Sequence, residues 1–298
     1  MKKKKFCGEI ITEMGAGLGN QMNIYAAVRN FSIKRNVDLY LDLTWFSTWP
    51  KYIELREFGL KKFNINAKIA KKSKIRKYIF RTKIRYLNGL LRRLKIKGKR
   101  VFDEGKDFNN VNEFLSLPIN IYVRGYFNLG YFRDIRKTLK KEFVLKDKKK
   151  IAPILKEVKK NNSVAVHVRR GDLLKLKKGY VLPMGYYKKA FSFIEKRVTN
   201  PLFFVFSDDI GWCEKNLKWI GNVRFIKGNS VEEDFEIMKN CKHKIIANSS
   251  LSWWAAYLSD FKNEIVISPR HLGGFYVDDK EKLKEIEKKI LPEWVIVE

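Results

Sequence analysis

The chain has 298 residues, of which 45% are hydrophobic and 14% aromatic, enough to bury a core in one large domain or two smaller ones. No run approaches the roughly 18 apolar residues of a membrane-spanning helix. Three widely spaced cysteines exclude a disulfide framework and predict free thiols in a reducing compartment. The net charge of +31 indicates an anionic partner, which is a phosphorylated small molecule, a nucleic acid or an acidic membrane surface.

The start of the chain has the order strand, glycine-rich loop, helix, strand, which is typical of a Rossmann-like unit with parallel strands. The glycines follow a G-x-G-x-G spacing, so the loop is either a weak nucleotide-binding signal or only a tight turn. Asn20 and Gln21 place two amides at the start of the helix, where they are candidates to bind a polar ligand. The expected elements are a strand at 6–11, a loop at 12–21, a helix at 22–35 and a strand at 37–43.

Residues 61–100 form a basic segment with 17 lysines and arginines in 40 residues and no acidic residue. Apolar residues recur among the charges at near-helical spacing, which predicts an amphipathic helix or a broken pair of helices. Such a segment either lies on an anionic membrane or is a solvated part of the domain surface. Nucleic-acid binding is not expected, because no fingerprint for it occurs. The apolar positions are Ile75, Ile79, Leu87, Leu90, Leu91 and Leu94.

From residue 120 onward, strands and helices alternate, and the lysine-rich stretch 146–150 is the best candidate for a linker. The pattern predicts an α/β fold with two Rossmann-like domains facing across a cleft, at 1–148 and 149–298. Before the linker, a strand is expected at 120–123 and a helix at 131–143. After it, strands are expected at 163–168, 202–206, 222–226, 244–247 and 264–267, and helices at 151–159, 184–197, 211–217, 231–240, 252–258 and 280–290.

The stretch from Ser163 to Asp172 joins a buried strand to a dense group of polar residues. Strand periodicity puts His167 and Arg169 on one face. Ligands of open α/β sheets sit at the carboxyl ends of strands. Arg169 and Arg170 therefore suit a diphosphate, because a guanidinium binds phosphate oxygens bidentately and keeps its charge.

Ser207, Asp208 and Asp209 follow the next strand, at the same edge of the predicted sheet. Their carboxylates are candidates to accept hydrogen bonds from a base or ribose. The alternative is that an aspartate here only caps the helix that follows.

Asn248 and the serines after it open the helix that carries Trp253 and Trp254. One serine is expected to cap this helix, and the helix N-terminus with its hydroxyl groups is also expected to bind phosphate. The adjacent tryptophans do not share a helix face, so one is expected in the core and the other toward the cleft. The hydroxyl-bearing residues are Ser249, Ser250 and Ser252.

No D-x-D triplet, metal-type histidine spacing or P-loop motif occurs, so no metal site is predicted, and the arginines are expected to take the place of a metal ion. The basic start of the chain is followed by too few apolar residues for a signal peptide. A cytoplasmic protein is therefore expected, with peripheral attachment to the inner face of the membrane as an open alternative.

Taken together, four stretches resemble the bacterial α-1,2-fucosyltransferases of glycosyltransferase family 11, relatives of the α-1,6- and protein O-fucosyltransferases. The stretches are Gly17–Met22, His167–Asp172, Phe206–Asp209 and Asn248–Trp254. The resemblance implies a GT-B fold in which the second domain holds most of the donor, GDP-fucose, and the first takes the acceptor. It implies inverting, metal-independent transfer of fucose, without a cofactor, to the 2-hydroxyl of a terminal galactose or similar sugar in surface polysaccharide or O-antigen synthesis.

By this resemblance Arg169 holds the diphosphate and His167 lies near the guanosine. Asp172 is a candidate general base, although the turn can equally use it to orient Arg170. Another nucleotide-sugar donor, or a non-enzymatic protein that binds membrane or nucleic acid, is the alternative function. Acceptor recognition is expected on loops around Trp45, Trp49 and 124–127. The expected donor-binding residues are Asn20, Gln21, His167, Arg169, Arg170, Ser207, Asp208, Asp209, Asn248, Ser249 and Ser250.

Overall fold

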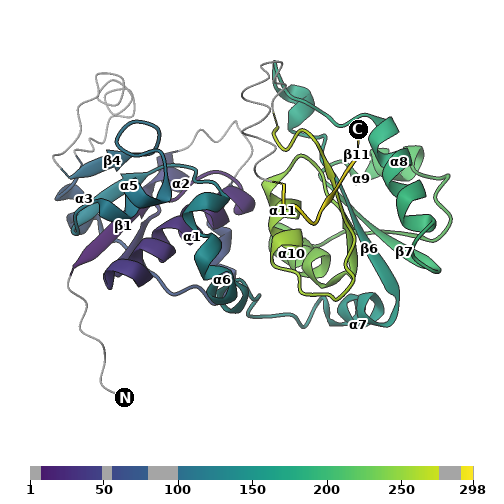
Figure 1. Cartoon of the computed structure of the whole chain (residues 1–298), viewed down its shortest axis with the longest axis horizontal. Helices are drawn as coiled ribbons and strands as arrows, with labels where there is room; N and C mark the ends of the chain where they lie inside the picture. Colours follow the sequence, from purple (N-terminus) through teal and green to yellow (C-terminus); the bar gives the residue numbers. More distant parts are fainter. Residues whose placement is uncertain (1–7, 49–55, 80–99, 275–289, 298) are drawn as a thin grey trace. The chain divides into compact units, whose positions relative to one another are not determined.

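The computed structural model describes residues 8–48, 56–79, 100–274 and 290–297 (Figure 1). The chain divides into two compact units, Met1–Val144 and Leu145–Glu298, and each has its own parallel β-sheet. The predicted α/β class is therefore confirmed. Each unit is described below by itself.

The first unit is built on a five-stranded sheet in the order β3-β2-β1-β5-β4, with all neighbours parallel. Helix α1 begins at Leu18, earlier than the expected residue 22, and Leu18, Gln21 and Met22 of its first turns are already buried. The strands are β1 Glu9–Glu13, β2 Asp38–Asp42, β3 Lys68–Ile69, β4 Val101–Asp103 and β5 Ile121–Arg124. The helices are α1 Leu18–Arg35, α2 Thr44–Thr48, α3 Lys72–Arg76, α5 Val111–Ser116 and α6 Arg136–Glu142, with short 3₁₀ turns at Gly59–Lys62, Leu129–Tyr131 and Arg133–Ile135.

The basic segment was predicted to form an amphipathic helix or a broken pair of helices, either on a membrane or on the domain surface, and its described part holds one short helix. Residues 61–79 contribute strand β3 and the short helix α3 to the first unit. Ile75 and Ile79 are only 3% and 8% exposed, because they pack in a core cluster with Ile11 and Tyr122. These two apolar residues of the predicted helix are thus part of the protein core. Leu87, Leu90, Leu91 and Leu94 lie outside the described residues.

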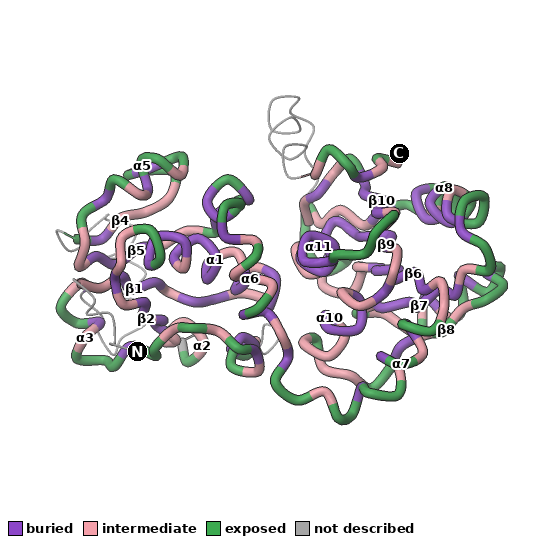
Figure 2. The backbone as a smooth tube through the Cα atoms, turned by 60° about the horizontal axis from the view of Figure 1, so that its bottom comes forward, coloured by how far each residue is buried: buried purple, intermediate pink, exposed green. Residues whose placement is uncertain are grey.

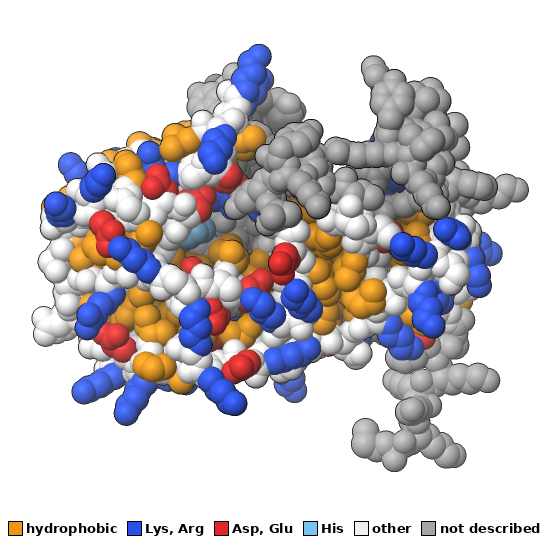
Figure 3. Space-filling model, turned by 180° about the vertical axis from the view of Figure 1, so that it is seen from behind, with side chains coloured by type: hydrophobic (Ala, Val, Ile, Leu, Met, Phe, Trp, Pro, Cys, Tyr) orange, Lys and Arg blue, Asp and Glu red, His pale blue; other side chains and the backbone are white. Residues whose placement is uncertain are grey.

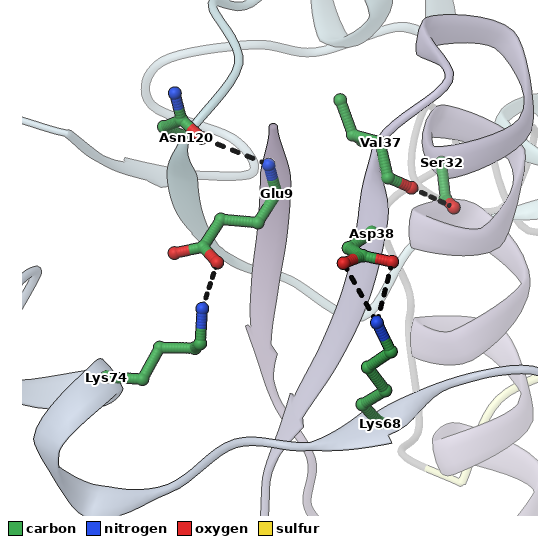
Figure 4. Close-up of polar contacts among 7 residues, drawn as sticks. All are labelled: Glu9, Ser32, Val37, Asp38, Lys68, Lys74 and Asn120. Carbon is green, nitrogen blue, oxygen red and sulfur yellow. Dashed lines mark hydrogen bonds and ion pairs between the residues drawn. The ribbon is translucent and has the colours of Figure 1, made fainter. Parts of the chain in front are cut away.

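Ion pairs attach the same segment to the sheet (Figure 4). Lys68 Nζ lies 2.9 Å from one carboxylate oxygen of Asp38, and Lys74 pairs with Glu9. These lysines therefore have partners within the protein. Membrane contact by the segment as a whole stays a prediction.

The second unit is built on a six-stranded parallel sheet in the order β11-β10-β9-β6-β7-β8. Three short strands, β3, β4 and β11, were not expected from the sequence, and most of the expected helix at 280–290 lies outside the described residues. The strands are β6 Asn162–Val168, β7 Pro201–Ser207, β8 Val223–Phe225, β9 His243–Ile245, β10 Val266–Pro269 and β11 Val295–Val297. The helices are α7 Ala152–Lys160, α8 Met184–Glu195, α9 Ile210–Asn216, α10 Val231–Asn240 and α11 Ser250–Tyr257, with a 3₁₀ turn at Leu173–Lys175.

Strand β6 lies in the interior of its sheet, and Figure 2 shows it as buried along most of its length. Val164, Val166 and Val168 pack in one cluster with side chains of α8. His167 and Arg169 lie on the other face, where both contact α11 or the residue before it. The strand alternation predicted for 163–168 is confirmed.

Lysine and arginine side chains are spread over the face that Figure 3 shows, among acidic and hydrophobic ones. Among the described residues, no helix is long and apolar enough to cross a membrane.

Candidate functional site

Three loops of the second unit meet at the carboxyl edge of its sheet. Val168, the last residue of β6, pairs with Ser207, the last residue of β7, and Val166 pairs with Ile245 at the end of β9. Because these strands are parallel neighbours, the residues that follow them emerge side by side. The sequence motifs at 169–172, 207–209 and 248–250 are thus brought together.

Arg169 is held in place from two sides. Its Nε donates to Asp172 Oδ1 at 3.2 Å, its Nη2 pairs with the other oxygen of Asp172, and its Nη1 donates to Ser249 Oγ at 3.4 Å. Both side chains of the pair remain 27% exposed, so the guanidinium is oriented yet accessible. A fixed, accessible guanidinium next to a helix start is the arrangement that binds phosphate oxygens.

Arg170 connects two loops. Its backbone N–H donates to Asp208 Oδ1 at 2.9 Å and its Nε donates to Asp209 Oδ2 at 3.1 Å, while its guanidinium carbon lies 4.0 Å from the centre of the Trp212 ring. The interpretation that Asp172 orients Arg170 is therefore wrong, because Asp172 pairs with Arg169 and Asp209 pairs with Arg170. Arg170 stabilises the loops beside Arg169, and a direct donor contact for it stays a prediction.

Ser207 and Asp209 of the Ser-Asp-Asp motif form hydrogen bonds within their own loop and with the start of helix α9. Asp209 caps α9 by accepting from Trp212 N–H at 3.3 Å, and Ser207 Oγ accepts from the Asp209 N–H at 2.9 Å. Asp208 lies against Gly171, where an added Cβ would come within 3.2 Å of the carboxyl carbon. Capping is thus one role of this motif, and base or ribose binding by it stays a prediction.

His167 is buried beneath Arg169. Its Nδ1 lies 2.9 Å from Ser252 Oγ, and its backbone carbonyl accepts from Tyr187 Oη at 3.2 Å. Burial lowers the pKa of His167 from 6.5 to about 4, with a smaller contribution in the same direction from the positive charge of Arg169. The imidazole is therefore neutral at neutral pH.

This pKa shift predicts an acid-sensitive fold. Between pH of about 6.5 and 4 the unfolded chain binds a proton at His167 that the folded chain does not, so stability falls as the pH drops through this window. The full loss for one such group is roughly 3 kcal/mol. Asp234 acts in the opposite direction, because burial raises its carboxyl pKa to about 6.

The contribution of His167 is therefore measured as a difference between two proteins. Urea unfolding of the wild type and of His167→Gln at pH 7.5, 6.0 and 5.0 should give a steeper loss of stability for the wild type. Parallel stability curves for the two proteins would contradict the buried, neutral state of His167.

Helix α11 begins at the site. Ser249 is its N-cap and accepts from Leu251 N–H at 3.3 Å. One tryptophan of this helix was expected in the core and the other toward the cleft, and Trp254 confirms the first part of this expectation. Trp253 and Trp254 are both buried, because Trp253 stacks on Tyr257 with ring centres 4.8 Å apart and Trp254 fills the interior.

Residues 109–298, more than half of the chain, match the sequence model of glycosyl transferase family 11. The chain belongs to glycosyltransferase family 11.

Two bacterial relatives align with most of the glycosyltransferase, and a mammalian relative aligns with about half of it. An α-1,2-colitosyltransferase of Escherichia coli is 32% identical over 272 residues, covering 87% of this chain and 91% of the relative. The O-antigen biosynthesis glycosyltransferase WbnK of Escherichia coli is 33% identical over 296 residues, covering 91% and 96%. Galactoside α-(1,2)-fucosyltransferase 2 of Rattus norvegicus is 30% identical over 182 residues, covering 55% of this chain and 50% of the relative.

Solved fucosyltransferases share the fold of this glycosyltransferase. NodZ α-1,6-fucosyltransferase soaked with GDP-fucose matches with a TM-score of 0.52 and 12% identity, covering 86% of this chain and 93% of that chain. A mutant of Arabidopsis thaliana FUT1 in complex with GDP matches with a TM-score of 0.52 and 10% identity, covering 89% of this chain and 71% of that chain. These likenesses confirm the predicted fold class.

In the first unit of the glycosyltransferase, Asn20 and Gln21 lie in the first turn of α1 rather than in a loop. Gln21 is 1% exposed, and its amide donates to the carbonyls of Ala16 and Glu57 and accepts from Gly59 N–H. Its side chain thus organises the loops around the glycine-rich turn. Donor contacts by Asn20 and Gln21 stay predictions.

The contacts of Asn248 and the place of His271 beside it were not predicted from the sequence. Asn248 donates through Nδ2 to the carbonyls of Tyr180 and Gly273, and His271 packs against the Tyr180 ring with centres 4.9 Å apart. The only sequence signal for His271 was its place shortly after a strand of the same sheet. Among the described residues, no group of three or more His, Cys, Asp or Glu side chains is placed to hold a metal ion.

Proposed function

We propose that this glycosyltransferase moves fucose from GDP-fucose to the 2-hydroxyl of a terminal galactose or similar sugar, with inversion at the transferred carbon and without a metal ion. The observation that carries this proposal is the oriented, accessible guanidinium of Arg169 at the carboxyl edge of the second sheet. The α-1,2 linkage is supported by the names of the colitosyltransferase and the galactoside fucosyltransferase among its relatives. A role in O-antigen synthesis is supported by WbnK.

In the proposed reaction the leaving group, GDP, must be stabilised as it departs. As the bond between the sugar carbon and the diphosphate oxygen breaks, negative charge grows on GDP. Arg169 would offset this charge, and one well-placed donor of this kind contributes roughly 3 to 4 kcal/mol to the barrier reduction. The guanidinium would thereby take the part that a metal ion plays in other nucleotide-sugar enzymes.

Both carboxylate oxygens of Asp172 bind Arg169, so we assign Asp172 to positioning of Arg169 rather than to proton transfer. The proton of the acceptor hydroxyl would pass to another base.

The acceptor is proposed to bind the first unit, at the carboxyl edge of its sheet. Tyr126 follows β5 and is strongly exposed, and Trp45 follows β2 and packs against Gly15. Accessible aromatic rings and nearby polar groups suit a sugar, which has apolar faces and polar edges. Trp49 lies outside the described residues.

A second candidate donor is a nucleotide-activated colitose. The relative named as a colitosyltransferase is about as similar to this chain as WbnK is. Colitose lacks the 3-hydroxyl of fucose, so the two donors differ at one position of the transferred sugar.

The test is a transfer assay with GDP-fucose, GDP-colitose, GDP-mannose and UDP-galactose, each with a β-galactoside acceptor in excess EDTA. The proposal expects turnover with GDP-fucose and a product joined through the galactose 2-hydroxyl, identified by NMR. Faster turnover with GDP-colitose would favour the second candidate. Strict dependence on added Mg²⁺ or Mn²⁺ would contradict the metal-free reaction.

A further inference from the structure

Two neighbouring residues of the second unit carry buried polar atoms without hydrogen-bond partners among the described residues. These atoms are Oδ1 of Asn248 and both ring nitrogens of His271. Asn248 is only 4% exposed. More than nine in ten buried polar groups in proteins have a partner, so two such residues in one place need an explanation.

The two residues belong to one packed cluster. Tyr180 connects them, because its carbonyl accepts from Asn248 Nδ2 at 2.6 Å and its ring lies against His271. The loop after β10 is tied to the same place, since Gly273 O accepts from Asn248 at 3.0 Å and Gly274 O accepts from Tyr180 N–H at 3.0 Å.

This cluster adjoins the Arg169 site. Asn248 directly precedes Ser249, which accepts from Arg169. In the sheet, β9 lies between β6 and β10, so the loop bearing Asn248 lies between the loop bearing Arg169 and the loop bearing His271. The two loops that carry the unpartnered atoms therefore leave the sheet on the side of the Arg169 loop that is away from β7.

The orientation of the Asn248 amide is determined by its partners. Both groups facing Nδ2 are backbone carbonyls, which only accept, so the nitrogen and not the oxygen must face them. The unpartnered atom is consequently Oδ1, which can only accept a hydrogen bond.

Because Oδ1 can only accept a hydrogen bond, a ligand that binds it must offer a hydrogen-bond donor. Phosphate oxygens of a nucleoside diphosphate also only accept, so a phosphate does not satisfy Asn248. A hydroxyl group both donates and accepts, and it can satisfy Oδ1 and either ring nitrogen of His271. We propose that Asn248 and His271 bind hydroxyl groups of the sugar nucleotide next to the diphosphate held by Arg169, an inference that rests on the proposed function.

The variant His271→Phe tests this inference. Phenylalanine keeps a ring against Tyr180 and removes two nitrogens that have no partner among the described residues, so thermal stability should not fall. The affinity for the sugar nucleotide should fall about tenfold. His271→Gln restores a donor and an acceptor and should recover part of this loss.

Isothermal titration with GDP and with GDP-fucose, without acceptor, locates the hydroxyl groups. Weaker binding of GDP-fucose alone assigns them to the transferred sugar, and equal weakening of both ligands assigns the contact to the GDP part, in which the ribose carries the hydroxyl groups. Either result supports the proposal. The matched control is His243→Phe, at the opposite end of β9. His243 Nδ1 accepts a hydrogen bond from Ile265 N–H, so this change should lower stability without altering the affinity for GDP or for GDP-fucose.

Unchanged affinity of His271→Phe for both ligands would overturn the inference, and so would a melting temperature lowered by several degrees. Failure of this inference and failure of the proposed function give different experimental results. A wild-type protein that binds no GDP-sugar contradicts the proposed function, whereas wild type and His271→Phe binding GDP-fucose equally well contradict only this inference.

Discussion

Replacing Arg169 by alanine should reduce kcat/KM for fucosyl transfer by about 10³-fold or more. The guanidinium would otherwise offset charge that develops on the departing GDP, and loss of one such donor costs 10²- to 10³-fold in enzymes that use uncharged donors. The fold should persist, because the pair with Asp172 is partly exposed and such pairs contribute about 1 kcal/mol or less. Initial rates at saturating acceptor, together with a melting curve, measure both effects.

Two further variants give this experiment its controls. Arg169→Lys keeps the charge but not the planar fork, so its activity should lie between those of the wild type and the alanine variant. Arg224→Ala removes an arginine that pairs with Glu157 on the exposed surface at 3.1 Å, and it should leave activity unchanged. Near wild-type turnover of Arg169→Ala would remove Arg169 from the mechanism.

Replacing Asp172 by asparagine should lower kcat/KM by about 10- to 100-fold, chiefly by weakening GDP-fucose binding. Asparagine has the shape of aspartate but only one accepting oxygen, so the guanidinium of Arg169 loses its bidentate partner. A positioning role leaves the pH dependence of kcat unchanged in shape. Donor titration and a pH–rate profile of kcat measure the two quantities.

A general base at this position gives a different pattern. Its removal lowers kcat by roughly 10²- to 10⁴-fold, abolishes the acidic limb of the pH–rate profile and leaves donor affinity intact. That pattern would restore the catalytic role considered for Asp172 from the sequence. Glu157→Gln, the partner change on the exposed Arg224 pair, is the matched control and should alter neither quantity.

Much of the second unit was predictable because its strands are short apolar runs separated by helices. The strand expected at 163–168 is β6 Asn162–Val168, and the helix expected at 231–240 is α10 Val231–Asn240. The proximity of the motifs at 169–172, 207–209 and 248–250 was predictable because parallel strands bring their carboxyl ends to the same edge of a sheet.

Side-chain partners were less predictable. Arg169 and Arg170 are adjacent and alike, and only the folded loops show that Asp172 pairs with the first and Asp209 with the second. The spacing of Ile75 and Ile79 fits a membrane-surface helix and a core helix equally well, because both need an apolar face. His271 and its unpartnered nitrogens follow from packing against Tyr180, which no local pattern encodes.

The most direct test of the account is a crystal structure of the protein with GDP bound. The account predicts that diphosphate oxygens lie about 3 Å from the guanidinium nitrogens of Arg169 and near the start of α11 at Ser249. A well-ordered GDP whose diphosphate lies elsewhere, with Arg169 still bound only to Asp172 and Ser249, would contradict it.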